Sequence, residues 1–241
     1  MNGSDTSKQN ITPVFVVIGA TGGIGPELCR RLTTKGARLV MAGRDADRLQ
    51  VFAEELGASP MVLDATRSEH VDQAFTRILE EYGRIDGVAN CVSSLLLKPA
   101  HLTTNAEWTS TLATNLTSAF VTVRAATQAM MKTGGSIVLV SSAVARVGLA
   151  NHEAVAAAKA GVLGLALSAA ASYASRGIRV NCVAPGLVQT LLTPRDGEQD
   201  CPQRINGNAP IRAHRRAYGH CRRDRVVSGS RAELGHWPGA D

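Results

Sequence analysis

Up to Thr193, the chain alternates between two patterns of apolar and polar positions. Short runs of mostly β-branched apolar residues are typical of buried parallel strands, and longer stretches with an apolar residue every three or four positions are typical of helices. Their alternation predicts an α/β fold, a Rossmann-like doubly wound parallel sheet with helices on both faces. The predicted strands are 14–18, 37–45 with its following loop, 61–63, 87–90, 137–141 and 179–183, and the predicted helices are 27–35, 45–56, 68–82, 105–131 and 153–175.

A glycine-rich turn separates the first predicted strand from the first helix, which Pro26 opens at no cost in backbone hydrogen bonds. Glycines let a backbone approach a pyrophosphate, and a helix N-terminus presents free N–H groups and a positive dipole end. We therefore predict a dinucleotide phosphate site here, with an ordinary tight turn as the alternative. The residues predicted to form it are Gly19, Thr21, Gly23, Ile24 and Gly25.

Polar residues and a Pro-Gly pair follow three later strands. Asn90, Ser142 and Pro185 each stand where a predicted strand ends. Right-handed crossovers bring the ends of parallel strands to one edge of the sheet, so we expect these residues to meet in one cleft.

The motifs, taken in order, resemble the short-chain dehydrogenase/reductase family. The G-x-x-x-G-x-G turn, VLDAT with Asp64, ATNLTSAF with Asn115, GGSIVLVSS ending at Ser142, AAAKAG with Lys159 and RVNCVAPGLVQT carry the resemblance. It covers about residues 13–193, which we expect to form one dinucleotide-binding domain between a disordered arm (1–12) and an irregular tail (194–241). The resemblance implies further cofactor contacts at Asp64, Ala65, Asn90, Lys159, Pro185, Gly186 and Thr190.

The end of the second strand bears on the choice of nicotinamide cofactor. An acidic residue there would accept hydrogen bonds from the ribose 2'-hydroxyl, whereas an arginine suits a 2'-phosphate. Gly43 and Arg44 occupy the place, which favours NADP(H) over NAD(H). The alternative is that Arg44 is merely solvated and Asp45 caps the next helix.

The resemblance also implies catalytic roles. In this family a tyrosine donates the proton to a carbonyl, a lysine one helical turn later lowers its pKa and holds the ribose, a serine orients the substrate oxygen and an asparagine supports a water relay. Lys159, Ser142 and Asn115 match, and Val155 takes the place of the tyrosine. The predicted function is hydride transfer between NADP(H) and a small-molecule carbonyl or secondary alcohol.

Valine has no proton to give, and losing a positioned general acid costs roughly a hundred- to ten-thousand-fold in rate. His152 lies three residues before Val155 and is a candidate replacement acid, with a solvated or capping histidine as the alternative. The alternative for Lys159 is a lysine whose charged end lies at the surface. The alternative for Ser142 and Asn115 is that they are polar groups that only pack at a strand end and in a helix. The second function considered is a catalytically silent NADP(H)-binding sensor or partner subunit.

Residues 194–241 break the alternation, with nine arginines, no lysine, six acidic residues and neither period. The family resembled would continue with helices and a last strand. Codons that encode AELGHWPG (232–239) permit QSWVTGQ when they are read one base later, and that is the family's usual approach to its last strand. We therefore hypothesise a shift of reading frame between Thr193 and Arg195. The last strand of the sheet is then missing, and the tail is disordered or poorly packed.

Composition limits the partners. Five scattered cysteines without a C-x-x-C motif argue against a disulfide framework and a metal site. We find no strongly apolar run of eighteen residues and expect a cytoplasmic protein without a membrane partner. The tail's arginines are interspersed with acids, so nucleic-acid binding is not predicted. Small residues in helices 105–131 and 153–175 predict a homodimer, although they could serve only to pack against the sheet.

Overall fold

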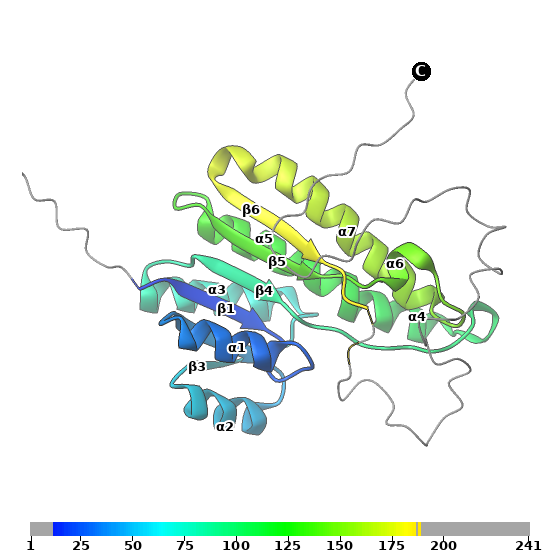
Figure 1. The fold of residues 1–241 in the computed structure, drawn as a ribbon, viewed down its shortest axis with the longest axis horizontal. Coiled ribbons are helices and arrows are strands. Elements are labelled where there is room, and N and C mark those ends of the chain that lie inside the picture. The colour runs from blue at the N-terminus through cyan, green and yellow to red at the C-terminus, as the bar shows by residue number, and fades with distance from the viewer. Residues whose placement is uncertain (1–11, 187, 189–241) are drawn as a thin grey trace, which may run out of the picture. The chain divides into compact units, whose positions relative to one another are not determined.

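Strands and helices alternate through residues 12–186 and 188, the part of the chain that the computed structural model describes (Figure 1). The strands are β1 (Val14–Ile18), β2 (Arg38–Gly43), β3 (Ser59–Val62), β4 (Gly87–Asn90), β5 (Gly135–Val140) and β6 (Ile178–Val183). The α-helices are α1 (Gly25–Thr34), α2 (Ala46–Leu56), α3 (Ser68–Tyr82), α4 (Asn105–Leu112), α5 (Ser118–Met130), α6 (Val144–Val147) and α7 (Glu153–Tyr173). Shorter helical turns are η1 (Ala100–Leu102), η2 (Ala113–Thr117) and η3 (Ala174–Arg176).

Within the described residues, the strands form one parallel sheet in the order β3-β2-β1-β4-β5-β6. The strand order reverses between β1 and β4, and open α/β sheets bind ligands beyond the strand ends at such a point. The doubly wound parallel sheet predicted from the sequence is confirmed. It directs the loops after β1, β4 and β5 to one edge.

Helices cover the two faces of the sheet unequally. One apolar cluster joins the sheet to α3, α5 and α7, and a second joins it to α1 and α2. β5 contacts α5 and α7, and β6 contacts α7, and these helices lie behind the two strands in Figure 1. On the face that α1 shares, Val183 at the end of β6 is 53 % exposed. Within residues 12–186 and 188, the end of β6 is therefore packed mainly from the side of α7.

The helix predicted over 105–131 is present as a continuous helical stretch, but it is not a regular α-helix throughout. The structure divides it into α4 and α5 around η2, a π-helical turn. Asn115 Nδ2 donates to the carbonyl oxygen of Thr111 at 3.0 Å, and this is the acceptor that the Asn115 N–H would use in an α-helix. π-turns inside helices are frequent at functional sites.

The long helix α7 continues through η3 as one helical stretch, Glu153–Arg176. By length and composition it is the one helix in the described part of the chain that is apolar enough to cross a membrane, which corrects the expectation that the chain has no strongly apolar run of eighteen residues. Core helices pass the same test. α7 contacts β5 and β6 and buries Lys159.

Candidate active site

Backbone contacts determine the shape of the glycine turn after β1. Gly19 has φ +80°, and a Cβ there would lie 2.9 Å from the backbone of both Cys91 and Val92. A Cβ on Gly25 would overlap the Gly19 carbonyl oxygen and lie 2.8 Å from Cα of Ala20. Side chains are thus excluded where the β1 turn, the β4 end and α1 meet. Such a bare turn before a helix N-terminus fits a pyrophosphate.

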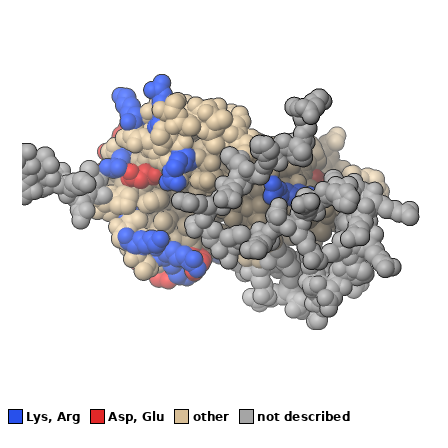
Figure 2. All heavy atoms as spheres, turned by 45° about the horizontal axis from the view of Figure 1, so that its top comes forward, with Lys and Arg blue, Asp and Glu red and all other residues tan. Residues whose placement is uncertain are grey.

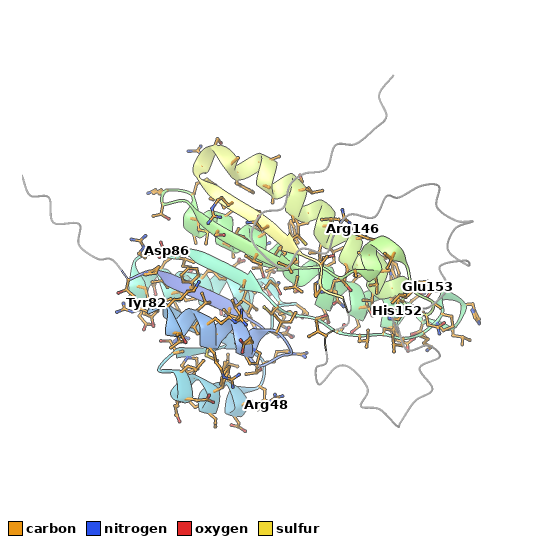
Figure 3. All side chains as sticks on the ribbon, viewed as in Figure 1. Arg48, Tyr82, Asp86, Arg146, His152 and Glu153 are labelled. Carbon is orange, nitrogen blue, oxygen red and sulfur yellow. The ribbon has the colours of Figure 1, made fainter. Side chains whose placement is uncertain are left out.

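The loop after β2 meets the same turn. Asp45 accepts a hydrogen bond from the Arg48 N–H at 3.0 Å and caps α2, as the alternative interpretation proposed. Arg48 Nη2 donates to the Thr21 carbonyl oxygen at 3.3 Å, which ties α2 to the glycine turn (Figure 3). Arg44 is exposed beside these groups. Arg48 was not predicted from the sequence. The pattern that indicates it is a basic residue in the first turn of α2, following Arg44 in the preceding loop.

Asp64 follows β3 and is held by Thr66. Its Oδ1 accepts from the Thr66 N–H at 2.9 Å and from Thr66 Oγ1 at 2.8 Å. The hydrogen bond from the Thr66 backbone, together with the nearby Arg44 and Arg67, holds the pKa of this carboxyl below its ordinary value. The next residue, Ala65, is buried.

Asn90, at the end of β4, is a buried clamp between strand and helix. Its Nδ2 donates to Thr122 Oγ1 on α5 at 2.9 Å, and its Oδ1 accepts from the Val92 N–H at 2.9 Å. These bonds position the backbone of 91–92 against Gly19.

Asn115 is buried in η2 and clamps the loop after β4. Its Oδ1 accepts from Ser93 Oγ and from the Ser94 N–H, both at 3.2 Å. Its Nδ2 donates to Ser94 Oγ at 2.9 Å as well as to Thr111. A side-chain amide has two N–H donors and one oxygen acceptor with two lone pairs, so this network uses its full capacity.

Lys159 is buried in α7, with 2 % of its surface exposed, so the alternative of a surface lysine is wrong. Its Nζ donates to the Val140 carbonyl oxygen at 2.9 Å, and its own carbonyl accepts from Ser141 Oγ at 2.7 Å. Burial lowers the pKa of Lys159 to about 8, against smaller raising effects of Cys182 and Cys91. The ammonium group is therefore anchored at the end of β5.

Ser142 and Val155 lie on the two segments that Lys159 links. Ser142 follows β5, and the Val144 N–H approaches its Oγ at 3.4 Å. The neighbouring Ala143 N–H donates to the Pro185 carbonyl oxygen at 2.9 Å, which brings Pro185 and Gly186 beside the serine. Val155 lies in the first turn of α7 and is buried, 4 % exposed.

His152 directly precedes α7 (Figure 3). Its Nδ1 lies 2.7 Å from the Ala150 carbonyl oxygen. Because a carbonyl only accepts, this contact is a hydrogen bond only when Nδ1 carries the proton. The loop between β4 and α4 binds the turn that precedes α7, since the Lys98 N–H donates to the Asn151 carbonyl oxygen at 2.8 Å.

The structure therefore places the predicted residues that it describes after β1, β2, β3, β4, β5 and β6, in η2 and in the first two turns of α7, with His152 directly before that helix. The ends of these parallel strands share one edge of the sheet. Thr190 and the predicted shift of reading frame lie outside the described residues, as does all of the predicted arm except Thr12. Among the described residues no cluster of metal-ligating side chains occurs. Figure 2 shows Lys and Arg interspersed with Asp and Glu on one face of the molecule.

Comparison with known proteins agrees with this geometry. A family model described as short chain dehydrogenase matches residues 13–200. D-threitol dehydrogenase of Mycolicibacterium smegmatis is 35% identical over 185 residues, which cover 74% of this chain and 71% of the relative. The 3-oxoacyl-[acyl-carrier-protein] reductase FabG of Vibrio cholerae is 35% identical over 187 residues, 75% of each chain.

A solved structure with the same fold is a variant of actinorhodin polyketide ketoreductase with NADPH. It superposes with a TM-score of 0.72 at 28% sequence identity and covers 75% of this chain and 72% of that chain. A short-chain type dehydrogenase/reductase from Mycobacterium ulcerans gives the same TM-score at 26% identity, over 75% of this chain and 69% of that one.

Proposed function

Because this chain belongs to the short-chain dehydrogenase family, we propose that it transfers hydride between NADP(H) and a carbonyl or secondary alcohol of a small molecule. The observation that carries the proposal is Lys159, buried and anchored to the end of β5 beside Ser142. A buried lysine is costly, and one held at the ligand edge of a doubly wound sheet is well placed to bind a ribose.

The choice of NADP(H) rests on the loop after β2. Asp45 is engaged as the cap of α2, which leaves the exposed Arg44 to meet the ribose 2' position. An arginine pairs with a phosphate through charge-assisted hydrogen bonds. The glycine turn, whose added Cβ atoms would meet backbone, fits the pyrophosphate of the same cofactor. When bound, that cofactor supplies or accepts the hydride.

Proton transfer falls to His152 in this proposal. Val155 has no exchangeable proton, and the His152 Nδ1 contact leaves Nε2 as the exchanging atom. In reduction the charged imidazole gives a proton to the forming alkoxide, and in oxidation the neutral imidazole takes it. Ser142 orients the substrate oxygen, while Asn115 holds the loop after β4.

A catalytically silent NADP(H)-binding sensor is the second candidate, favoured by the buried valine at position 155. Both functions predict that NADPH raises the melting temperature, and more than NADH does. Carbonyl-dependent oxidation of NADPH across a panel of ketones and aldehydes distinguishes them, with His152→Gln as the matched variant. The enzyme function predicts turnover that His152→Gln lowers. The sensor function predicts binding without turnover, and absence of any NADPH effect contradicts both.

We further propose a cytoplasmic homodimer formed through the helices α4, α5 and α7. Large apolar side chains on these helices face outward, with Phe120 50 % and Leu167 53 % exposed. Burial of such side chains against a second copy removes apolar area from water. Sedimentation of the wild type against Phe120→Glu tests this, because a charge there should yield monomers.

A further inference from the structure

The loop between β4 and α4 spans the two sides of the candidate site. Near its start, Ser93 and Ser94 bind the amide of Asn115. Near its end, the Lys98 N–H donates to the Asn151 carbonyl oxygen at 2.8 Å. One segment therefore holds the site's buried asparagine and also holds the turn that precedes α7.

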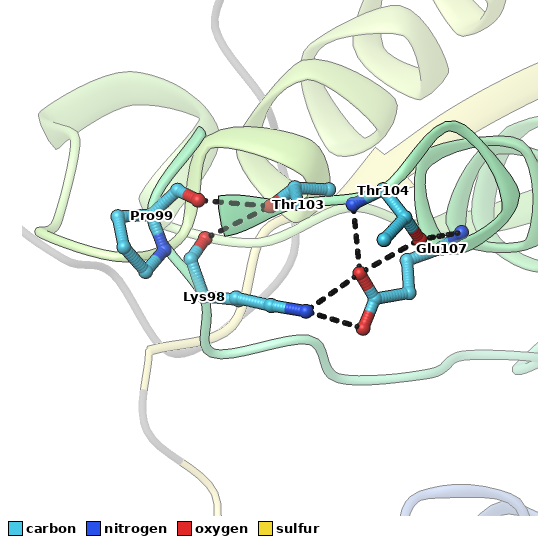
Figure 4. A network of polar contacts seen from close by, with 5 residues as sticks. All are labelled: Lys98, Pro99, Thr103, Thr104 and Glu107. Atoms are coloured by element: carbon cyan, nitrogen blue, oxygen red, sulfur yellow. Dashed lines mark hydrogen bonds and ion pairs between the residues drawn. The ribbon is translucent and has the colours of Figure 1, made fainter. Parts of the chain in front are cut away.

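An ion pair anchors the far end of this loop to α4 (Figure 4). Lys98 Nζ lies 2.8 Å from both Glu107 carboxylate oxygens. Glu107 also accepts from the Thr104 N–H at 2.8 Å and from Thr104 Oγ1 at 3.0 Å. The Glu107 N–H donates back to Thr104 Oγ1 at 3.2 Å, which completes a capping box at the start of α4. The hydrogen bond from Lys98, with those from Thr104, lowers the pKa of Glu107 to about 2. The Glu107 carboxylate is therefore ionised throughout the neutral range.

The turn that receives this loop has an unusual backbone. Asn151 has φ +62°, in the left-handed region, where asparagine is tolerated better than most residues. This turn allows the His152 ring to reach back to the Ala150 carbonyl oxygen at 2.7 Å. The neutral tautomer of His152 thus depends on the path of residues 150–152, and the Lys98 N–H binds the middle of that path.

We propose that the Lys98–Glu107 pair is a positioning element for His152. It holds the loop that binds Asn151, keeps the imidazole proton on Nδ1 and leaves Nε2 as the atom that exchanges a proton with substrate. The inference deepens the proposed function, on which the catalytic role of His152 rests. Neither residue of the pair stood out as functional in the sequence, although T-x-x-E at 104–107 is a capping-box signal.

The direct test is the tautomer of His152, measured by nitrogen NMR of the full chain at alkaline pH, where imidazole is neutral. The resonance is assigned by its loss in His152→Gln. The wild type is expected to carry the proton on Nδ1, and Lys98→Met to show a mixture of the two tautomers. Arg124→Met is the matched control, because it breaks a comparably exposed ion pair, with Asp72, on α5 and α3. The inference is overturned if Lys98→Met keeps the wild-type tautomer, or if Arg124→Met changes it equally.

A second pair of variants keeps the test decisive if Lys98→Met does not fold. Asn151→Gly retains the left-handed turn at no steric cost, whereas Asn151→Val strains it. The expected result is a wild-type tautomer in Asn151→Gly and a mixture in Asn151→Val. Identical tautomers in these two variants would contradict the proposal.

The activity arm separates this inference from the proposed function. Lys98→Met should lower kcat for carbonyl reduction roughly tenfold through misplacement of the acid, with no change in the Kd for NADPH. Lys98→Arg should restore kcat, since it keeps the charge facing Glu107. If the wild type does not bind NADPH, the proposed function fails, and the tautomer measurement still decides the positioning role.

Discussion

The glycine turn after β1 and the first turn of α7 lie at the same edge of the sheet but differ in what builds them. At Gly19 and Gly25 the contacts are backbone against backbone, and an added Cβ meets main-chain atoms. At Val155 the backbone is an ordinary α-helix, and only the identity of the side chain bears on the proposed proton transfer. Sterics thus exclude side chains from the proposed phosphate site, whereas position 155 accommodates an apolar residue within an ordinary helix.

The largest effect expected from this comparison is a gain of activity. Val155→Tyr places a phenol one helical turn before Lys159, and a positioned acid contributes roughly a hundred- to ten-thousand-fold. We expect carbonyl-dependent NADPH oxidation to rise, by less than that factor because His152 is the proposed acid of the wild type. Val155→Phe is the control, since it adds the ring without the hydroxyl. Equal rates in both variants would show that the surrounding site is not assembled for this chemistry.

The glycine turn should respond in the opposite way. Gly25→Ala forces Cβ onto the Gly19 carbonyl oxygen, so the turn must open and the phosphate cradle is lost. We expect NADPH affinity to fall roughly 100-fold, about 2.7 kcal/mol, together with a lower melting temperature. Isothermal titration and thermal shift measure the two effects. An unchanged Kd for NADPH would show that the close backbone contacts at Gly25 are not needed for cofactor binding.

Lys159 belongs to both regions in the proposed function, in which it lies beside the reacting groups and binds the cofactor ribose. Its pKa of about 8 means that the ammonium loses its proton as pH rises through 8. A charged donor binds an anionic cofactor more tightly than a neutral one. NADPH affinity should therefore be highest below pH 8 and fall roughly tenfold above it. Titrations of wild type and Lys159→Met across this range check the assignment, since the pH dependence should vanish in the variant.

The smallest expected effect concerns a glycine that no close contact requires. A Cβ at Gly164, in α7, meets nothing within 4 Å. Gly164→Ala should therefore stabilise the helix by about 0.5–1 kcal/mol. Chemical denaturation should show a higher midpoint with an unchanged slope, and NADPH binding should not change. A destabilised variant would indicate that this face of α7 is covered in solution.

Much of this architecture was predictable because its elements repeat simple patterns. The bounds of β1, α3 and β4 agree with the sequence prediction, since apolar runs and helical periodicity end there at glycine or polar residues. β3 begins earlier than predicted, at Ser59, because an edge strand tolerates Pro60. α6 was missed because four residues are too few to show a period.

The site was predictable only in part. Positions after the predicted strands located Gly19, Asn90 and Ser142 at one edge, and the family resemblance supplied Lys159. The division of the helix at Asn115 was not visible, because it arises from an amide that competes for a backbone acceptor. The contact of Lys98 with Asn151 joins residues more than 50 positions apart, and no local pattern encodes the path of such a loop.

The strand order also determines which strands can pair while the chain is still being synthesised. β1 is made first but lies inside the sheet, and its second neighbour, β4, ends only at Asn90. Pairing over such separations is slow, and chains generally fold from the N-terminus during translation. The four strands β3-β2-β1-β4, with the glycine turn, are thus complete in sequence well before the ribosome reaches Thr193. An altered reading frame beyond that residue would come too late to prevent their assembly.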